Sequence, residues 1–343
     1  MGYPHFAPTL LWNLPLPSEL GVKKPANIFA FSLDDKFLFT LHEDQGGILW
    51  DLTTTSLPRK LEFGQDNPSS KHPIRAAALD GNNGLIIAFG LTHPAEYYNI
   101  PKDGTLLKLA NYVLPVANDV KVSRDGSVFA FTTGATVELW DAHSFQEVKV
   151  LIPNVETRNQ FEKVALSQDN KYVATIDSEG QFFVWGLDND FHKVSQNSEV
   201  GIDLGQGWIP SSIGLSEHNF VMAALRKRTT LGQDSWMLMS WGYKYEGPDN
   251  TLYAKEYPNC ALTCVAPSTV FSVSLTPEGH LRGSDSMLWP LFSTEQGASK
   301  KGKAVSCGIS ESSKVFAAAR TNGRVAVWRL YTQDADPNER YPG

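Results

Sequence analysis

The sequence predicts an all-β protein built from repeats of one small antiparallel sheet. Residues 120–151 contain four short apolar runs, rich in Val, Phe, Thr and Leu, that alternate over a few residues. Such alternation is typical of strands rather than helices. Turn-forming residues, among them Asp125, Gly126 and Gly134, separate the first three runs. The stretch therefore predicts a sheet of four strands.

The same pattern recurs along the chain. An aromatic residue closes an apolar run at Trp50, Tyr98, Trp140, Trp185, Trp241, Trp289 and Trp328. The six intervals average about 46 residues, close to the ~40–45 residues of a four-stranded propeller blade. Upstream of most markers, an apolar strand leads into a Ser and a polar turn, as at residues 31–36, 122–126, 166–170, 215–219 and 309–313. The repeats predict a single seven-bladed β-propeller over residues 8–331.

The Trp-Asp pairs at residues 50–51 and 140–141 resemble the markers of the WD-repeat β-propeller family. The other blades lack Trp-Asp, and the Gly-His pair that usually opens such a repeat is missing. The polar network of the family is therefore expected to be largely absent, and the blades to depend on aromatic and aliphatic packing. The resemblance implies a non-catalytic scaffold subunit of a multiprotein complex, which binds its partners on one face of the ring.

The ends of the chain suggest how the ring closes. The last blade shows three strands, and residues 332–343 are polar, which predicts a flexible tail. Residues 9–14 form an apolar run without a blade of their own. We expect this N-terminal strand to complete the last blade.

Composition limits the function classes. The net charge of −7 argues against duplex nucleic acid as the main partner, because phosphate binding needs clustered Lys and Arg. The three cysteines are too few for a disulfide scaffold and predict buried thiols in an intracellular protein, cytoplasmic or nuclear. No apolar run reaches the ~18 residues of a membrane span, and the N-terminus does not resemble a signal peptide.

The longest connections are predicted to share one face. In the family's topology, the loops between second and third strands and those between blades open on the same side of the ring. Here they include residues 65–73, 91–96, 153–160, 195–207, 226–235 and 295–303. Long loops on a rigid scaffold are where binding residues tend to lie.

Candidate partner-binding residues lie in or beside these loops. The basic ones are Arg226, Lys227, Arg228, Lys300, Lys301, Lys303 and Arg158, and the aromatic ones are Trp208 and Trp236. The basic residues suit an acidic or phosphorylated protein segment, and single-stranded RNA in a ribonucleoprotein is an alternative. Solvated loop charges that bind nothing are the simpler interpretation. Exposed Trp side chains would serve as interface anchors.

The sequence offers little catalytic chemistry. Cys260 and Cys264 form a C-x3-C pair without the further ligands that zinc requires, and no cofactor motif or small-molecule substrate is indicated. The remaining enzyme hypothesis is a central-channel site using Asp80, Asp119 and Glu162. Polar residues at strand ends are the alternative interpretation of these carboxylates.

Overall fold

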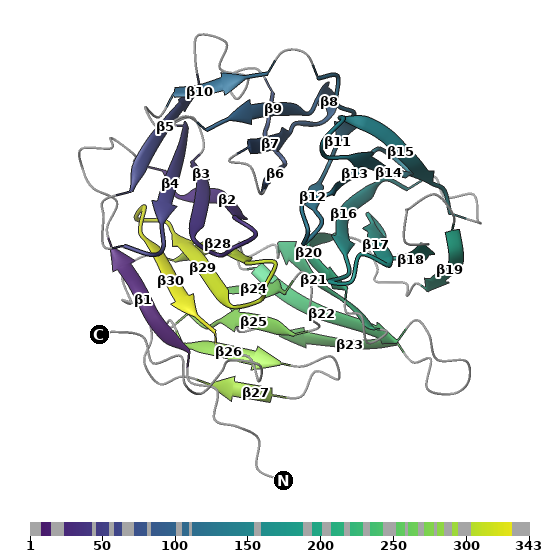
Figure 1. The fold of residues 1–343 in the computed structure, drawn as a ribbon. Coiled ribbons are helices and arrows are strands. Elements are labelled where there is room, and N and C mark those ends of the chain that lie inside the picture. Colours follow the sequence, from purple (N-terminus) through teal and green to yellow (C-terminus); the bar gives the residue numbers. More distant parts are fainter. Residues whose placement is uncertain are drawn as a thin grey trace.

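A computed structural model shows seven four-stranded blades arranged around a central axis (Figure 1). Among the residues it describes, the regular structure is entirely β, as the sequence predicts. The structure describes residues 8–14, 24–42, 46–54, 58–63, 72–80, 84–100, 105–109, 112–153, 159–187, 194–200, 207–215, 220–228, 234–242, 252–257, 260–266, 271–277, 280–284, 290–293 and 303–330.

Each blade runs from an inner strand beside the axis to an outer strand at the rim. Blades 1 to 4 comprise, from inside outward, β2 (Ala26–Phe31), β3 (Phe37–His42), β4 (Gly46–Asp51) and β5 (Arg59–Phe63); β6 (Ala76–Leu79), β7 (Gly84–Ala88), β9 (Glu96–Asn99) and β10 (Thr105–Lys108); β12 (Val120–Val122), β13 (Val128–Thr132), β14 (Val137–Asp141) and β15 (Gln146–Leu151); and β16 (Phe161–Leu166), β17 (Tyr172–Asp177), β18 (Phe182–Leu187) and β19 (Val194–Val200).

Blades 5 to 7 follow the same order. They comprise β20 (Trp208–Leu215), β21 (Phe220–Arg228), β22 (Asp234–Gly242) and β23 (Leu252–Tyr257); β24 (Leu262–Val265), β25 (Ser272–Leu275), β26 (Leu281–Ser284) and β27 (Pro290–Ser293); and β28 (Ala304–Ile309), β29 (Val315–Arg320), β30 (Val325–Arg329) and, at the rim, β1 (Thr9–Leu14). β1 is antiparallel to β30, with Thr9 opposite Arg329 and Leu14 opposite Val325. The two strands lie side by side in Figure 1.

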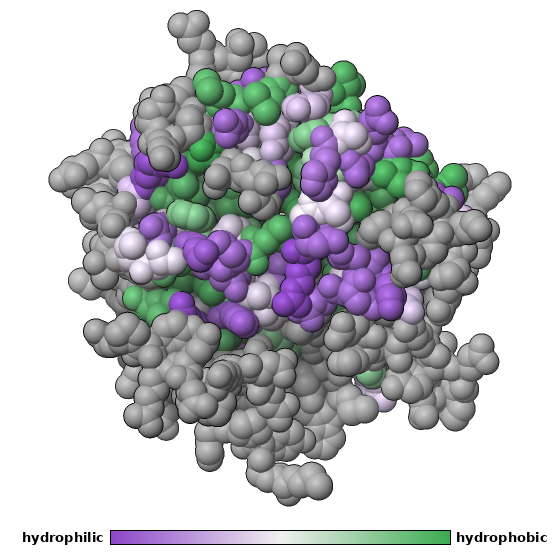
Figure 2. Space-filling model, in the orientation of Figure 1, coloured by the Kyte–Doolittle hydropathy of each residue, from purple (hydrophilic) through white to green (hydrophobic). Residues whose placement is uncertain are grey.

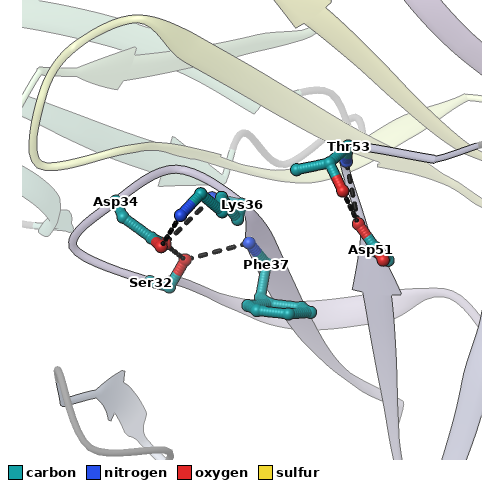
Figure 3. A network of polar contacts seen from close by, with 6 residues as sticks. All are labelled: Ser32, Asp34, Lys36, Phe37, Asp51 and Thr53. Carbon is teal, nitrogen blue, oxygen red and sulfur yellow. Dashed lines mark hydrogen bonds and ion pairs between the residues drawn. The ribbon is translucent and has the colours of Figure 1, made fainter.

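The Ser-containing turns between first and second strands share one hydrogen-bond pattern. In blade 1, the Ser32 hydroxyl donates to Asp34 at 2.7 Å and accepts the Phe37 backbone N–H at 2.9 Å (Figure 3). Blades 3 and 4 repeat it with Ser123 and Ser167. Three residues after each Ser, the backbone has a positive φ, for example 58° at Asp35. A short polar residue or Gly suits this conformation, which explains the recurring polar turn.

The Asp of each Trp-Asp pair fixes the turn into the outer strand. The Asp51 carboxylate accepts the backbone N–H of Thr53 at 2.9 Å and its hydroxyl at 2.6 Å (Figure 3). Asp141 accepts the N–H groups of His143 and Ser144 in the same way. The hydrogen bonds from Ser144 hold the pKa of Asp141 below its usual value. These contacts give the two Trp-Asp pairs a local structural role.

The core consists of apolar layers between neighbouring blades. Between blades 3 and 4, for example, Phe161, Phe183 and Trp185 are fully buried together. The third-strand aromatic residues Trp50, Tyr98, Trp185, Trp241 and Trp328 are also buried. Packing of aromatic and aliphatic side chains is therefore the main cohesive contact, as expected for degenerate repeats.

Blade 1 nevertheless contains a buried polar chain that the sequence analysis did not expect. Trp50 donates to the Thr40 hydroxyl at 2.9 Å, and that hydroxyl lies 3.1 Å from Nε2 of His42. Nδ1 of His42 lies 2.9 Å from the carbonyl of Lys24, so Nδ1 donates and Nε2 accepts. Burial lowers the pKa of His42, which favours this neutral form. In blade 4, by contrast, the indole N–H of Trp185 is buried without a partner among the described residues.

Four details differ from the predicted strand map. Residues 194–200, assigned in part to a loop, form the outer strand β19. Residues 91–96 contribute to β8 (Gly90–Pro94), which pairs with β11 (Val116–Ala117) as a two-stranded ribbon. The third strand of blade 6 is β26, so its predicted marker Trp289 follows that strand and lies outside the described residues. Finally, β5 and β10 pair in parallel at the rim and join blades 1 and 2 into one eight-stranded sheet.

The prediction of separate thiols is wrong for two of the three cysteines. Cys264 in β24 and Cys307 in β28 form a disulfide with a Cα–Cα distance of 6.3 Å, while Cys260 is free and buried. Adjacent blades place these two inner-strand positions side by side. Since disulfides are typical of oxidising surroundings, the cysteines no longer support a reducing compartment.

Candidate partner-binding face and central channel

The loops between second and third strands and the segments that enter each blade lie on one face, which we call the loop face. Backbone hydrogen bonds connect them directly. Phe161, which begins β16, donates to Gly134 in the β13–β14 loop at 2.7 Å. Lys303, just before β28, accepts the N–H of Thr321 in the β29–β30 loop at 2.8 Å. The turns between first and second strands lie at the opposite end of the ring, which we call the turn face.

Two of the predicted basic clusters meet on the loop face. Arg226 and Lys227 belong to the end of β21 and are partly exposed, so the predicted loop 226–235 begins as strand. Asp234, at the start of β22, lies 3.9 Å from Nε of Arg226 and 3.9 Å from Nζ of Lys303. A single carboxylate thus lies between cations from blades 5 and 7, and positive charge remains in excess.

The predicted aromatic anchors are not exposed. Trp208 is 8% exposed and Trp236 is 2% exposed, because each faces a neighbouring layer of the core. The ammonium group of Lys227 lies 5.7 Å from the Trp208 ring and covers it from the solvent side. In the propeller as described, these two indoles are core residues, and an anchoring role would require the blade to open.

The remaining predicted residues are less informative. Arg158, Lys300 and Lys301 lie outside the described residues, and Arg228 is the last residue of β21. The structure therefore brings together Arg226 and Lys303 around Asp234, whereas Lys227, the next residue of β21, has its ammonium group against Trp208.

A cavity of about 130 Å³ occupies the loop-face end of the central channel, and all seven blades contribute to its lining. Its ionisable lining residues among those described are Arg75, Lys121, Lys163 and Asp119. Arg75 and Asp119 immediately precede β6 and β12, at the loop-face ends of these inner strands. Figure 2 shows hydrophilic and hydrophobic residues interspersed around the centre of one face of the ring. The three cations were not among the residues selected from the sequence.

A second, smaller cavity lies toward the turn face. Lys121 lines both cavities, and Glu311, in the turn after β28, lines the second. Burial raises the pKa of Glu311, and the charge of Lys121 opposes that shift. Lys121 therefore lies between a cationic end and an acidic end of the channel.

The carboxylates of the enzyme hypothesis do not line one site. Asp119 alone of the three lines the larger cavity, where its carboxylate accepts the Val164 N–H at 3.1 Å and lies 3.8 Å from Nζ of Lys163. The Asp80 carboxylate accepts the hydroxyl of Tyr97 at 2.5 Å and the N–H of Gly84 at 2.6 Å. Glu162 is a partly buried residue of β16. These contacts give Asp80 and Asp119 structural partners.

Within the described ranges, no group of three or more His, Cys, Asp or Glu side chains is arranged to hold a metal ion. The same ranges contain no helix with the length and hydropathy that a bilayer crossing requires.

Seven four-stranded blades, Ser-containing turns and Asp-fixed outer turns define the class of this protein, a seven-bladed β-propeller whose repeats resemble those of the WD-repeat family. No family model matches the sequence. The chain is similar to the target of rapamycin complex subunit LST8 of Saccharomyces cerevisiae, at 22% identity over 52% of this chain and 57% of the yeast protein. It is also similar to the LST8 homolog of Drosophila melanogaster, at 25% identity over 51% of this chain and 40% of the fly protein. The matches thus span about half the length of these curated relatives.

Proposed function

We propose that this chain is a non-catalytic subunit of an intracellular multiprotein complex that docks an acidic segment of a protein partner on its loop face. The main supporting observation is the pair of cations Arg226 and Lys303 around Asp234, with Lys227 next to Arg226 in β21, on one face of a protein whose net charge is −7. Charge complementarity of this kind favours an acidic partner and accelerates its association.

The similarity to a yeast protein named as a complex subunit supports the subunit role. From this similarity we infer only the role of a complex subunit, and we describe the partner only as acidic. The rigid ring supports the docking role, because its blades are held by buried apolar layers and leave the loop face for recognition. RNA contact through the same cations is the competing function, and the experiment separates the two.

The test is affinity capture of the full chain from native extract at physiological salt, followed by cross-linking of the captured complex. The double variant Arg226→Glu with Lys227→Glu is compared with Lys171→Glu, which reverses an exposed charge on the turn face. We expect the double variant to lose the partner and Lys171→Glu to keep it, with loop-face cross-links in the wild type.

Three results would contradict the proposal. A wild-type chain that remains monomeric, without a stable partner, would remove the subunit role. Equal capture by the double variant and by Lys171→Glu would remove the loop face as the docking surface. Capture that disappears after nuclease treatment would favour the RNA function.

A further inference from the structure

Three cationic side chains from consecutive blades line the same cavity of the central channel. Arg75 enters from blade 2, Lys121 from blade 3 and Lys163 from blade 4. Across the cavity are the inner strands of the other blades, including Ser211 and Ser212 of β20. Since every inner strand contributes, the walls are fixed by the ring itself rather than by a loop.

The charges of this cavity are unequal. Among the described lining residues there are three cations and one carboxylate, that of Asp119. Asp119 is 4% exposed and is already engaged by the Val164 N–H and by Lys163. The described lining of this cavity thus carries a net charge of about +2 (three cations and one carboxylate), and confined cations of this kind attract an anion.

The stem of Arg75 has a defined position. It packs against Gly90, whose φ is +72°, and a Cβ atom at Gly90 would lie 3.3 Å from Cγ of Arg75. Among the described residues, no hydrogen bond or ion pair engages the guanidinium of Arg75. The planar guanidinium is thus free to donate two parallel hydrogen bonds to an oxyanion.

The volume of the cavity and the hydroxyl group of Ser212 also suit the binding of an oxyanion. The hydroxyl oxygen of Ser212 accepts the N–H of Val265 at 2.9 Å, which leaves its own proton available to donate. A cavity of about 130 Å³ is far larger than the ~10–15 Å³ that one water molecule needs on this measure. It therefore admits a group of several heavy atoms, such as a tetrahedral phosphate.

We propose that the loop-face end of the channel is a binding site for a small phosphate-class oxyanion, either a free phosphate or a small phosphate monoester. Arg75 binds two of its oxygens, Lys121 and Lys163 neutralise its charge, and Ser212 donates to a further oxygen. This site is separate from the docking function proposed above, since its cations lie inside the ring and those of the docking surface lie on β21 and before β28.

The test measures anion binding to the purified full chain by calorimetry in a phosphate-free buffer of constant ionic strength. The probes are inorganic phosphate, pyrophosphate and glycerol phosphate, with a phosphoserine peptide as a separate arm. We expect saturable binding of at least one small probe to the wild type and at least tenfold weaker binding to Arg75→Gln. Lys171→Gln, on the turn face, should bind like the wild type.

The unliganded Tm of Arg75→Gln should equal that of the wild type, because Arg75 is exposed to the channel. A ligand-dependent rise of Tm, present in the wild type and reduced in Arg75→Gln, provides a second measurement. The proposal is overturned if no small probe binds saturably, if Arg75→Gln binds as tightly as the wild type, or if only the phosphoserine peptide binds.

Discussion

Replacing Gly214 with Ala tests how closely the inner strands of blades 5 and 6 approach. A Cβ atom at Gly214 in β20 would lie 1.9 Å from the carbonyl oxygen of Ala266 and 2.9 Å from Cγ1 of Val265. The nearest atom belongs to the backbone, so it cannot rotate away as a flexible side chain would. The two strands must separate, and this stretches the hydrogen bond from Val265 N–H to Ser212, which is 2.9 Å long.

The magnitude follows from three contributions. Overpacking in a close-packed interior costs about 1–3 kcal/mol. Loss of the bond between Val265 and Ser212 adds about 0.5–1.5 kcal/mol. The smaller conformational freedom of Ala in the unfolded chain returns about 0.4–1 kcal/mol. We therefore expect Gly214→Ala to lower the free energy of unfolding by about 2 kcal/mol.

Urea denaturation followed by tryptophan fluorescence measures this change, because Trp208 and Trp241 belong to the same core layer as the neighbouring residue Ile213. Ser211→Ala, on the same strand and exposed, is the matched control and should remain within about 0.5 kcal/mol of the wild type. Ser212→Ala isolates the hydrogen-bond contribution. A Gly214→Ala protein as stable as the Ser211→Ala control would refute the close approach of β20 and β24.

Two further predictions concern covalent and electrostatic contacts. The Cys264–Cys307 disulfide joins residues 43 apart in the sequence, so its reduction should lower the free energy of unfolding by up to about 4 kcal/mol. The effect of reductant on Tm should vanish in Cys307→Ser. A wild-type Tm that does not respond to reductant would count against this pair. Glu96 is buried, which alone would raise its pKa, but hydrogen bonds from Lys108, Tyr98 and His93 outweigh burial and lower it. The ionised Glu96 therefore contributes fully to stability above about pH 4.5, and this contribution is lost as the pH falls. The urea midpoint of Glu96→Gln should change less between neutral and acidic pH than that of the wild type. Equal changes of the urea midpoint with pH in the two proteins would exclude this contribution.

The ring was predictable from the sequence because one physical requirement recurs in it. Every blade except the sixth, whose third strand β26 has the sequence LRGS, carries an aromatic residue in its third strand, and Trp50, Trp185 and Trp328 fill the layers against neighbouring blades at regular intervals. The first turn of a blade needs a Ser and a residue that tolerates positive φ, as at Ser32 and Asp35. Both signals are local, so a single sequence carries them.

The errors occurred where the signal was not local or not apolar. β19 has the sequence VSQNSEV, which contains few apolar residues, so its pattern does not indicate a strand. Trp208 and Trp236 directly follow predicted long loops and were expected to be exposed, whereas β20 and β22 begin at or before them and fix them against the neighbouring layers. Local periodicity does not define where a strand ends.

The disulfide and the channel cations share a sequence signal, which is the spacing between their residues. Cys307 follows Cys264 by 43 residues, Lys121 follows Arg75 by 46, and Lys163 follows Lys121 by 42. Each spacing is close to one blade, so these residues fall on neighbouring inner strands or immediately before them, around the same axis. A search for polar or cysteine residues repeated at the blade period would have selected both groups.

The parallel pairing of β5 with β10 has a mechanical consequence. Thr105 lies opposite Glu62 and Leu106 opposite Phe63, so main-chain contacts at the outer edge join the first two blades in addition to side-chain packing. On heating or under mechanical force, blades 1 and 2 should therefore move together as one rigid unit. Local opening of the ring should therefore occur first between blades that lack such main-chain pairing, and amide hydrogen exchange should begin there.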